Sequence, residues 1–268
     1  MIYMTPSPNE HTVLHTKNLS IGYTHKNSDL VVASQINIGL KKGELIGLVG
    51  ANGSGKSTLI RTLIKIQPAL KGDIFLNKTR LSHLSNLELA KNLSIVLTAP
   101  LISKNLSVTE LIALGRQPYT NWIGRLNEND KKAILDALDL VKITHLRHKK
   151  CYELSDGQLQ KVMIARALAQ DTEIIVLDEP TTHLDMYHKA YILKLLQQLT
   201  KETQKTILFS SHEIDLAIQL CNSMLVIKDQ NVIHGDPCEL IQKNIFQSLF
   251  PDDLITFDNA SGKFMISK

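Results

Sequence analysis

The nine residues from Gly50 to Thr58 constrain the fold of this chain more than any other segment. They match the pattern G-x-x-x-x-G-K-[ST], in which a glycine-rich turn wraps around phosphate groups. An apolar run at 44–49 precedes the pattern, and residues 57–66 follow it with apolar side chains at helical spacing. Strand, turn and helix therefore occur in the order that a phosphate-binding loop requires. At about 7% glycine, a chance match has odds on the order of one in a hundred, so we expect a P-loop here.

This segment predicts a site for nucleotide phosphates and Mg²⁺. Glycines let successive backbone N–H groups face an anion, and the N-terminus of the following helix adds partial positive charge. Lys56 is expected to reach the β- and γ-phosphates, and the hydroxyl of Ser57 is expected to bind Mg²⁺. The residues expected to contact the nucleotide are Gly50, Ala51, Asn52, Gly53, Ser54, Gly55, Lys56, Ser57 and Thr58.

Two adjacent carboxylates follow a second apolar run at 173–177. Asp178 and Glu179 stand at its C-terminal end, where parallel sheets place their ligand-binding residues. Asp178 suits a Mg²⁺ ion held through water, and Glu179 suits a general base for the attacking water. A strand that simply ends in two solvated acids would give the same residues, but the P-loop upstream favours the functional interpretation.

The composition bounds the class of protein. The chain has 268 residues, of which 43% are hydrophobic and 21% charged, as is ordinary for a globular protein. Its formal charge of +4 is too small to indicate a nucleic-acid groove, so we expect no nucleic-acid partner. Three cysteines without a CxxC pair argue against a zinc site or a disulfide framework. Because no apolar stretch approaches the ~18 residues that span a bilayer, and no signal peptide is expected, another chain would supply any membrane part.

Helical and strand patterns alternate along most of the chain. Alternating residues at 12–19 and 31–40 predict antiparallel strands, and 224–227 predicts a strand that ends the core. The middle of the chain becomes helical, with Asn127 as the expected N-cap of a helix at 128–141. This pattern favours an α/β fold with a mostly parallel sheet and a helical insertion. Other helices are expected at 57–66, 84–91, 108–114, 159–169, 186–203 and 213–221, and other strands at 44–49, 72–77, 93–97, 174–177 and 206–209.

The segment Leu-Ser-Asp-Gly-Gln at 154–158 opens a helix about twenty residues before Asp178. Ser155 is placed to cap this helix, whose first N–H groups would form a second anion site. Alone it is an ordinary helix start, but its position after the helical stretch makes it specific. It resembles the signature sequence of ABC-type ATPases, the nucleotide-binding subunits of ABC transporters. The resemblance extends from residue 12 to about residue 235.

The resemblance implies a P-loop NTPase fold with a RecA-like, mostly parallel core and an antiparallel β subdomain. It implies a nucleotide-binding domain at 12–240, a helical subdomain inserted at about 99–170 and a C-terminal extension at 241–268. The activity would be hydrolysis of ATP to ADP and phosphate, with Mg²⁺ as cofactor. Two copies would form a head-to-tail homodimer, with each ATP held between the P-loop of one subunit and the signature helix of the other.

Two motifs of the family concern the contact between subunits. Ser155, Gly157 and Gln158 match signature positions that would contact the nucleotide of the opposite subunit. The sequence Thr-His-Leu-Asp, which ends at Asp185, resembles the D-loop of the family. These four residues are therefore expected to complete the nucleotide site in the dimer.

Two further motifs concern the nucleotide bound to the same subunit. His212, in Ser-Ser-His-Glu after a strand, resembles the switch histidine that contacts the γ-phosphate, although a capping or core histidine would occupy a similar place. Tyr23 stands where the family stacks an aromatic ring on adenine, although a tyrosine near a strand end is common. The resemblance thus implies Glu179 and His212 as catalytic residues, Ser57 and Asp178 as metal ligands, and Tyr23 as an adenine contact.

The chain departs from the family pattern at two positions. Thr98 follows the strand at 93–97, where the family has a glutamine that contacts Mg²⁺ and the attacking water. A threonine would act there only through a water, and a plain strand-end threonine is an equally good interpretation. Asp156 replaces the usual glycine of the signature, and we expect its carboxylate to turn away from phosphate and cap a helix N–H.

The segment at 107–119 and the sequence Thr-Thr-His-Leu-Asp at 181–185 resemble those of importers for iron–siderophore complexes, haem and cobalamin. This resemblance implies import of a metal chelate through two transmembrane permease subunits, with a solute-binding protein as an indirect partner. The chain would lie on the cytoplasmic face of the inner membrane. The surface at 98–122 would receive a cytoplasmic helix of the permease, although Trp122 fits the interior of the helical subdomain equally well.

Two other functions are alternatives to import. One is a non-transport ABC ATPase that acts as a scaffold or regulatory protein without a membrane partner. The other is a small-molecule P-loop kinase, which is disfavoured because it leaves the signature helix unexplained. The end of the chain says little about function: 236–243 is expected to be helical, 246–250 to dock on the core and 255–266 to form a short hairpin.

Overall fold

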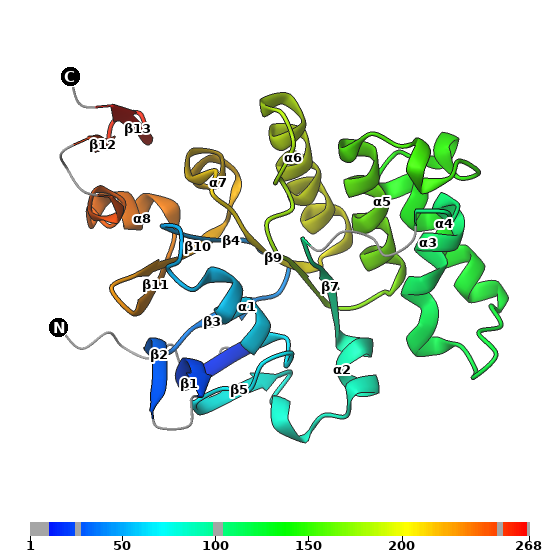
Figure 1. The fold of residues 1–268 in the computed structure, drawn as a ribbon, viewed down its shortest axis with the longest axis horizontal. Coiled ribbons are helices and arrows are strands. Elements are labelled where there is room, and N and C mark those ends of the chain that lie inside the picture. Colours follow the sequence, from blue (N-terminus) through cyan, green and yellow to red (C-terminus); the bar gives the residue numbers. More distant parts are fainter. Residues whose placement is uncertain (1–10, 25–27, 99–103, 251–253, 267–268) are drawn as a thin grey trace.

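The computed structural model describes residues 11–24, 28–98, 104–250 and 254–266 (Figure 1). Its centre is a six-stranded sheet with the strand order β11-β10-β4-β9-β8-β7. All neighbouring strands are parallel except β11, which pairs with β10 in the antiparallel sense. The strands are β4 (Leu45–Gly50), β7 (Leu93–Val96), β8 (Ile174–Leu177), β9 (Thr206–Ser210), β10 (Ser223–Lys228) and β11 (Asn231–Gly235). The expected α/β class with a mostly parallel sheet is confirmed.

The expectation that the core ends at 227 was wrong, because β11 adds an antiparallel edge strand. β4, β8 and β9 are buried along their whole length, which is why apolar runs identified them. β11 is only half-buried and has a mixed composition, so it carries no apolar run. Asp229 and Gln230, which form the turn into it, both have positive φ.

A second, antiparallel sheet contains β1 (Thr12–Thr24), β2 (Asp29–Ile36), β3 (Gly39–Lys41), β5 (Lys71–Leu76) and β6 (Thr79–Arg80). The single strand expected at 31–40 is in fact two strands, β2 and β3. Gln35 interrupts the alternation, because its backbone has a left-handed φ of 55°. β1 is also longer than expected and includes Tyr23, which lies opposite Leu30 of β2.

Helix α1 (Lys56–Leu63) packs between the two sheets, since Leu59, Ile60 and Leu63 belong to one buried cluster with strands of both. The opposite face of the central sheet is covered by α6 (Met186–Thr203) and α7 (Ile214–Leu220) (Figure 1). α2 (Asn86–Asn92) leads directly into β7. The P-loop therefore lies between a helix that touches both sheets and the ends of the parallel strands.

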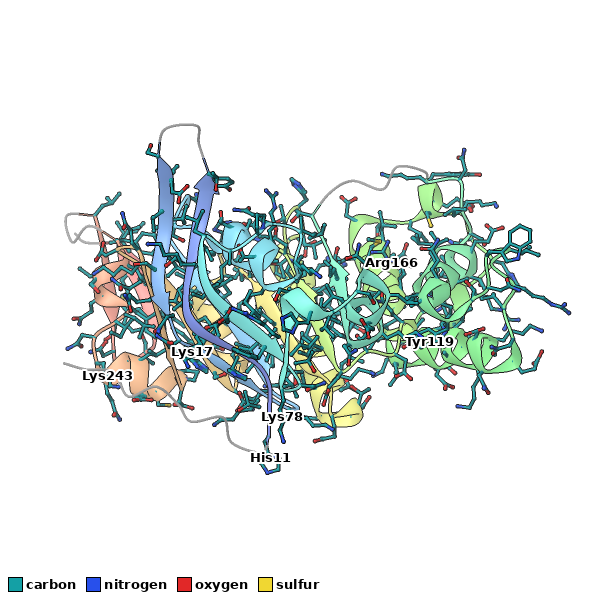
Figure 2. All side chains as sticks on the ribbon, turned by 90° about the horizontal axis from the view of Figure 1, so that it is seen from below. His11, Lys17, Lys78, Tyr119, Arg166 and Lys243 are labelled. Carbon is teal, nitrogen blue, oxygen red and sulfur yellow. The ribbon has the colours of Figure 1, made fainter. Side chains whose placement is uncertain are left out.

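The helical insertion contains α3 (Val108–Ala113), α4 (Glu128–Leu140) and α5 (Asp156–Ala169) and lies at one end of the molecule (Figure 1). A 3₁₀ helix at Leu114–Tyr119 follows α3. In Figure 2, Tyr119 and Arg166 mark this end, while Lys17 and Lys78 mark the antiparallel sheet. Arg166 of α5 donates a hydrogen bond to the carbonyl of Ile95 in β7, 3.3 Å away, and so connects the insertion to the sheet.

The C-terminal segment contains α8 (Pro237–Gln242), a 3₁₀ helix at Gln247–Leu249 and the hairpin β12 (Ile255–Asp258) with β13 (Lys263–Ile266). Phe246 is fully buried in the same cluster as the central sheet, as expected for docking on the core. Its ring centroid is 5.2 Å from that of Phe257, which in turn contacts Phe264. Within the described ranges, no helix has the length and hydropathy needed to cross a bilayer.

Candidate nucleotide site

The P-loop connects the end of β4 to the start of α1. Gly55 has a φ of 106°, and a Cβ atom there would lie 2.3 Å from Cγ1 of Val32, so only glycine fits. Gly53 has a φ of 75° and nothing within 4 Å of the position of its Cβ, which leaves open space over the loop. No described side chain caps the start of α1, so its first N–H groups can face an anion. This cradle fits the phosphates of a nucleotide.

Lys56 lies inside the curl of the loop. Its Nζ donates hydrogen bonds to the carbonyls of Gly50 at 2.9 Å and Ala51 at 3.2 Å, and the residue is only 5% exposed. Burial lowers the pKa of Lys56, while the nearby carboxylates of Glu179 and Asp178 act in the opposite direction. The ammonium group is therefore positioned at the phosphate site before any nucleotide is present.

The hydroxyl of Ser54 is buried and has no hydrogen-bond partner among the residues that the structure describes. An orphaned buried donor within a loop of this kind is costly unless a ligand or water satisfies it. Asn52 and Gly53, on the other side of the loop, are exposed. The loop thus offers both exposed backbone and an unused polar group to a ligand.

Asp178 follows β8 directly and lies beside the first turn of α1. Its Oδ1 accepts a hydrogen bond from the hydroxyl of Ser57 at 3.3 Å and another from Ser210 at 2.7 Å. Asp178 is 7% exposed, so its carboxylate is largely screened from bulk water. A hydroxyl and a carboxylate beside a phosphate cradle are hard oxygen donors of the type that Mg²⁺ prefers, and the pair fits this ion.

Glu179 is held in a left-handed backbone conformation with a φ of 48°. Its Oε1 lies 2.6 Å from Nε2 of His212, and its Oε2 accepts a hydrogen bond from Thr182 at 3.2 Å. The two expected catalytic residues are therefore in direct contact. Such a contact between a carboxylate and an imidazole is suited to holding a proton acceptor in a fixed orientation.

Thr98 lies beside Asp178, as the expected register requires. Its Oγ1 donates a hydrogen bond of 2.8 Å to the backbone carbonyl of Asp178, and the residue is exposed. The hydroxyl is thus engaged with the strand that carries the acidic pair. A catalytic role for Thr98 stays a prediction.

Tyr23 lies over the start of α1. Its hydroxyl is 3.1 Å from Oγ1 of Thr58, and 41% of the residue is exposed. The hydroxyl is thus fixed next to the P-loop while the residue stays partly exposed. This position suits the stacking role expected for Tyr23, which remains a prediction.

The signature segment forms a capping box at the start of α5. Ser155 accepts a hydrogen bond from the N–H of Gln158 at 3.3 Å, and the side chain of Gln158 accepts one from the N–H of Ser155 at 3.1 Å. The expectation that Asp156 caps a helix N–H was wrong, because Ser155 makes this cap and Asp156 is exposed. Gly157 is buried against His188, whose Cδ2 would lie 2.9 Å from a Cβ at this position.

Asp185 caps the start of α6. Its Oδ1 accepts hydrogen bonds from the backbone N–H and from Nδ1 of His188, each at 2.8 Å. The bond from the backbone N–H of His188, with the ring contact beside it, lowers the pKa of Asp185. His188 therefore touches both the expected D-loop and the signature glycine, Gly157.

The expected site residues form two separate groups. One consists of Tyr23, the P-loop, Thr98, the acidic pair and His212. The other consists of the signature segment and Asp185. In Figure 1, α6 lies between α1, which follows the P-loop, and α5, which begins with the signature segment. Among the described residues, no hydrogen bond or ion pair connects 154–158 to the P-loop.

Sequence reasoning missed Ser210 and Thr182, both of which contact the acidic pair. Ser210 was considered only as part of the switch-histidine segment. The signal was nonetheless present, because serine ends a buried strand and the carboxyl ends of parallel strands meet at one edge of a sheet. The strand order that brings Ser210 next to Asp178 was not available from the sequence.

Comparisons with known proteins agree with this geometry. Residues 33–182 match the ABC transporter family model. The iron(3+)-hydroxamate import ATP-binding protein FhuC of Bacillus subtilis (strain 168) is 37% identical over 241 residues, which cover 90% of this chain and 88% of that protein.

The solved structures that resemble this chain include members of the same family. An ABC transporter assigned to the metal-chelate type, in an inward-facing conformation, has a TM-score of 0.77 and 28% identity, with 89% of both chains covered. A dimeric ATP-binding cassette in a post-hydrolysis state with ADP and phosphate has a TM-score of 0.71 and 26% identity, over 84% of this chain and 98% of that one. The chain therefore belongs to the ABC transporter family and is an ABC-type ATPase.

Proposed function

We propose that this chain is the energy-coupling subunit of an importer for a metal chelate, such as an iron–siderophore complex, haem or cobalamin. The observation that carries the proposal is the similarity to a ferric-hydroxamate import protein, which extends over nine-tenths of the chain and includes the helical insertion. The similarity to a transporter assigned to the metal-chelate type supports it. Both similarities extend well beyond the nucleotide-binding motifs.

In this proposal the P-loop N–H groups and Lys56 bind the phosphates of ATP, and Tyr23 stacks on the adenine. Ser57 and Asp178 would hold Mg²⁺, which neutralises phosphate charge and orients the terminal phosphate. Glu179 accepts a proton from the attacking water. His212, which contacts Glu179 in this structure, would exchange that contact for the γ-phosphate when ATP binds.

Two copies of the chain would close around ATP in a head-to-tail homodimer. The second group of site residues, Ser155, Gly157, Gln158 and Asp185, lies apart from the P-loop and so is available to a partner subunit. The next two residues, Met186 and Tyr187, are 68% and 72% exposed, as is suited to an interface. A dimeric relative of this fold with ADP and phosphate supports this arrangement.

The helical insertion would receive the permease at the cytoplasmic face of the inner membrane. Trp122 is 94% exposed, so the alternative in which it packs inside the helical subdomain does not hold. Ile123, the next residue, and Leu114, eight positions earlier, are also exposed. Aromatic and aliphatic side chains of this kind are typical anchors of protein interfaces. Residues 99–103 of the expected surface lie outside the described residues.

Uptake of an iron-55-labelled ferric siderophore in the native host tests this function. A strain without the gene should lose uptake and regain it with the parental chain, but not with Glu179→Gln. Trp122→Ala should reduce uptake, whereas Leu135→Ala, an exposed apolar control on α4, should not. When the chain is purified from these strains, a polytopic permease should co-purify with the parental chain but not with Trp122→Ala.

Parental uptake by the deletion strain, for iron–siderophore complexes, haem and cobalamin alike, would contradict the import function. Retained ATPase activity without any bound membrane protein would then favour a scaffold or regulatory role. The two results are independent, because ATP hydrolysis is measured on the purified chain.

A further inference from the structure

Ser210 occupies the point where three parallel strands end together. It is the last residue of β9, and it lies opposite Leu48 of β4, the strand that feeds the P-loop. On the other side, Phe209 pairs with Leu177 of β8, so Ser210 stands next to Asp178. Ser210 has no exposed surface. Its hydroxyl is therefore buried between the strand of the P-loop and the strand of the acidic pair.

The hydroxyl of Ser210 makes two hydrogen bonds, one to each residue of the acidic pair. It donates to Oδ1 of Asp178 at 2.7 Å and accepts from the backbone N–H of Glu179 at 2.8 Å. A serine hydroxyl carries one donor and two acceptor lone pairs, so both bonds are compatible. The bond to the carboxylate is shorter than the one from Ser57, at 3.3 Å, and charge-assisted bonds are the stronger kind.

The hydrogen bond from the Glu179 N–H to Ser210 stabilises an unfavourable backbone conformation. Glu179 has a φ of 48°, a conformation that costs free energy for any residue other than glycine. Ser210 supplies the acceptor for its N–H, and Thr98 supplies a donor to the carbonyl of Asp178 just before it. The conformation that aims the Glu179 side chain toward the nucleotide site is thus held by two hydroxyls.

The bond to Asp178 determines which carboxylate oxygen remains available. Oδ1 accepts from Ser57 and Ser210, whereas no described residue donates to Oδ2. A carboxylate fixed in this way presents one oxygen to a ligand and uses the other as an anchor. Loss of Ser210 would free the carboxylate to rotate.

We propose that Ser210 is a positioning residue that sets both the Asp178 carboxylate for Mg²⁺ and the Glu179 backbone for catalysis. The inference rests on the roles proposed above for Asp178 and Glu179. It predicts that one buried hydroxyl, which does not touch the nucleotide, controls the Mg²⁺ dependence and the catalytic rate together.

Thr206 provides a matched control at the other end of β9. Like Ser210 it is fully buried, and its hydroxyl also accepts one backbone N–H, from Gly43 at 3.1 Å, and donates to one oxygen, of Lys41 at 3.0 Å. Thr206→Val therefore removes the same number of hydrogen bonds from the same strand, far from the acidic pair. Any general loosening of β9 should appear in this variant too.

The experiment measures binding of Mn²⁺, as a paramagnetic substitute for Mg²⁺, to the ADP-loaded protein by electron paramagnetic resonance. Ser210→Ala should weaken Mn²⁺ binding by about tenfold, the factor expected for losing a hydrogen bond to a charged group. Affinity for ADP without metal should stay at the parental value. Ser210→Thr, which keeps the hydroxyl, should restore metal binding, and Thr206→Val should leave it unchanged.

Steady-state ATPase assays give the second reading. Ser210→Ala should lower kcat at saturating Mg²⁺ while KM for ATP changes little, because Glu179 loses its backbone support. Should Ser210→Ala not fold, Ser210→Cys, which fills the same space with a weak donor, takes its place in both assays.

The outcomes separate this inference from the proposed function. Parental metal binding by Ser210→Ala (or by Ser210→Cys in its place), or an equal loss in Thr206→Val, overturns the positioning role. Asp178→Asn serves as the reference: if it too binds Mn²⁺ normally, the proposed metal role of Asp178 fails, and the positioning role with it. A loss in Asp178→Asn without a loss in Ser210→Ala overturns the positioning role alone.

Discussion

Asp130 is buried against Arg116 in the helical insertion, and Asp130→Asn should destabilise the protein by about 3 kcal/mol. Nε of Arg116 donates to Oδ1 of Asp130 at 2.9 Å, and the two side chains are only 8% and 1% exposed. Nη1 of Arg116 also donates to the carbonyl of Ala169 at 2.7 Å. The pair therefore connects the 3₁₀ helix after α3, the first turn of α4 and the end of α5, the helix that begins with the signature segment.

The magnitude follows from the burial of both charges. Removal of one partner of a buried ion pair typically costs ~3–5 kcal/mol, because the other charge stays buried without compensation. Part of this cost is offset here, since the guanidinium of Arg116 lies 4.0 Å from the ring centroid of Tyr119, and a cation–π contact contributes on the order of 1 kcal/mol. About 3 kcal/mol remains, equivalent to a fall in Tm of roughly 6–12 °C.

Urea denaturation followed by far-UV circular dichroism measures this change. Asp136→Asn is the matched control on the same helix, because the ion pair of Asp136 with Lys132 is exposed and its loss should not be measurable. The double variant Arg116→Met/Asp130→Leu should recover most of the lost stability, since no unpaired charge remains. Equal midpoints for Asp130→Asn and Asp136→Asn would refute the reasoning.

The same pair makes stability depend on pH. Burial alone would raise the pKa of Asp130, but the hydrogen bond from the N–H of Asn127 and the contacts with Arg116 together lower it. Because the folded pKa lies below the unfolded value of about 3.9, the contribution is present above that pH and is lost as the pH falls through the folded value. Asp130→Asn should therefore flatten the stability profile below about pH 4.

Three substitutions test the proposed nucleotide chemistry. Lys56→Ala should weaken ATP binding roughly 30-fold or more, measured by titration with a fluorescent analogue, because a buried cation facing the phosphates is lost. Glu179→Gln should bind ATP normally but hydrolyse it about 10²–10⁴ times more slowly, and light scattering should show an ATP-loaded dimer; a parental rate would exclude the general-base role. Thr98→Ala removes a hydrogen bond to a backbone carbonyl and should cost under about 1 kcal/mol with little change in rate. A tenfold fall in rate would instead show that the reaction depends on Thr98, through this hydrogen bond to the backbone of Asp178 or through a water.

Helix boundaries were predicted well where a capping residue and an apolar periodicity agreed. Asn127 caps α4 as expected, with its side chain 2.9 Å from the N–H of Asp130, and α6 has the bounds predicted for it. The strand predictions failed where the backbone departs from regular geometry. The positive φ of Gln35, near the end of β2, leaves no mark in a hydrophobic pattern, since it is a local conformation and not a matter of composition.

In the candidate site, too, the features contained in one short segment were predicted, whereas the contacts between distant segments were not. The P-loop and the acidic pair were found because each lies in one short segment whose order of strand, turn and ligand residues is itself the signal. The bonds of Ser210 with Asp178 and of His212 with Glu179 join segments more than 30 positions apart. They follow from the strand order β4-β9-β8, which no local pattern specifies.

Several polar side chains expected to bind nucleotide or Mg²⁺ already have a partner within the chain, whereas the hydroxyl of Ser54 has none among the described residues. Lys56 is bonded to two loop carbonyls, Ser57 to Asp178, and Glu179 lies against His212. A bound nucleotide must replace these contacts, so part of its binding free energy is used to rearrange the chain. Ser210 is different, because its two partners are Asp178 and Glu179 themselves. Neither of its hydrogen bonds involves a group that we expect to change partners when nucleotide binds. We therefore expect the acidic pair to stay in place while the P-loop lysine and the switch histidine exchange partners around it.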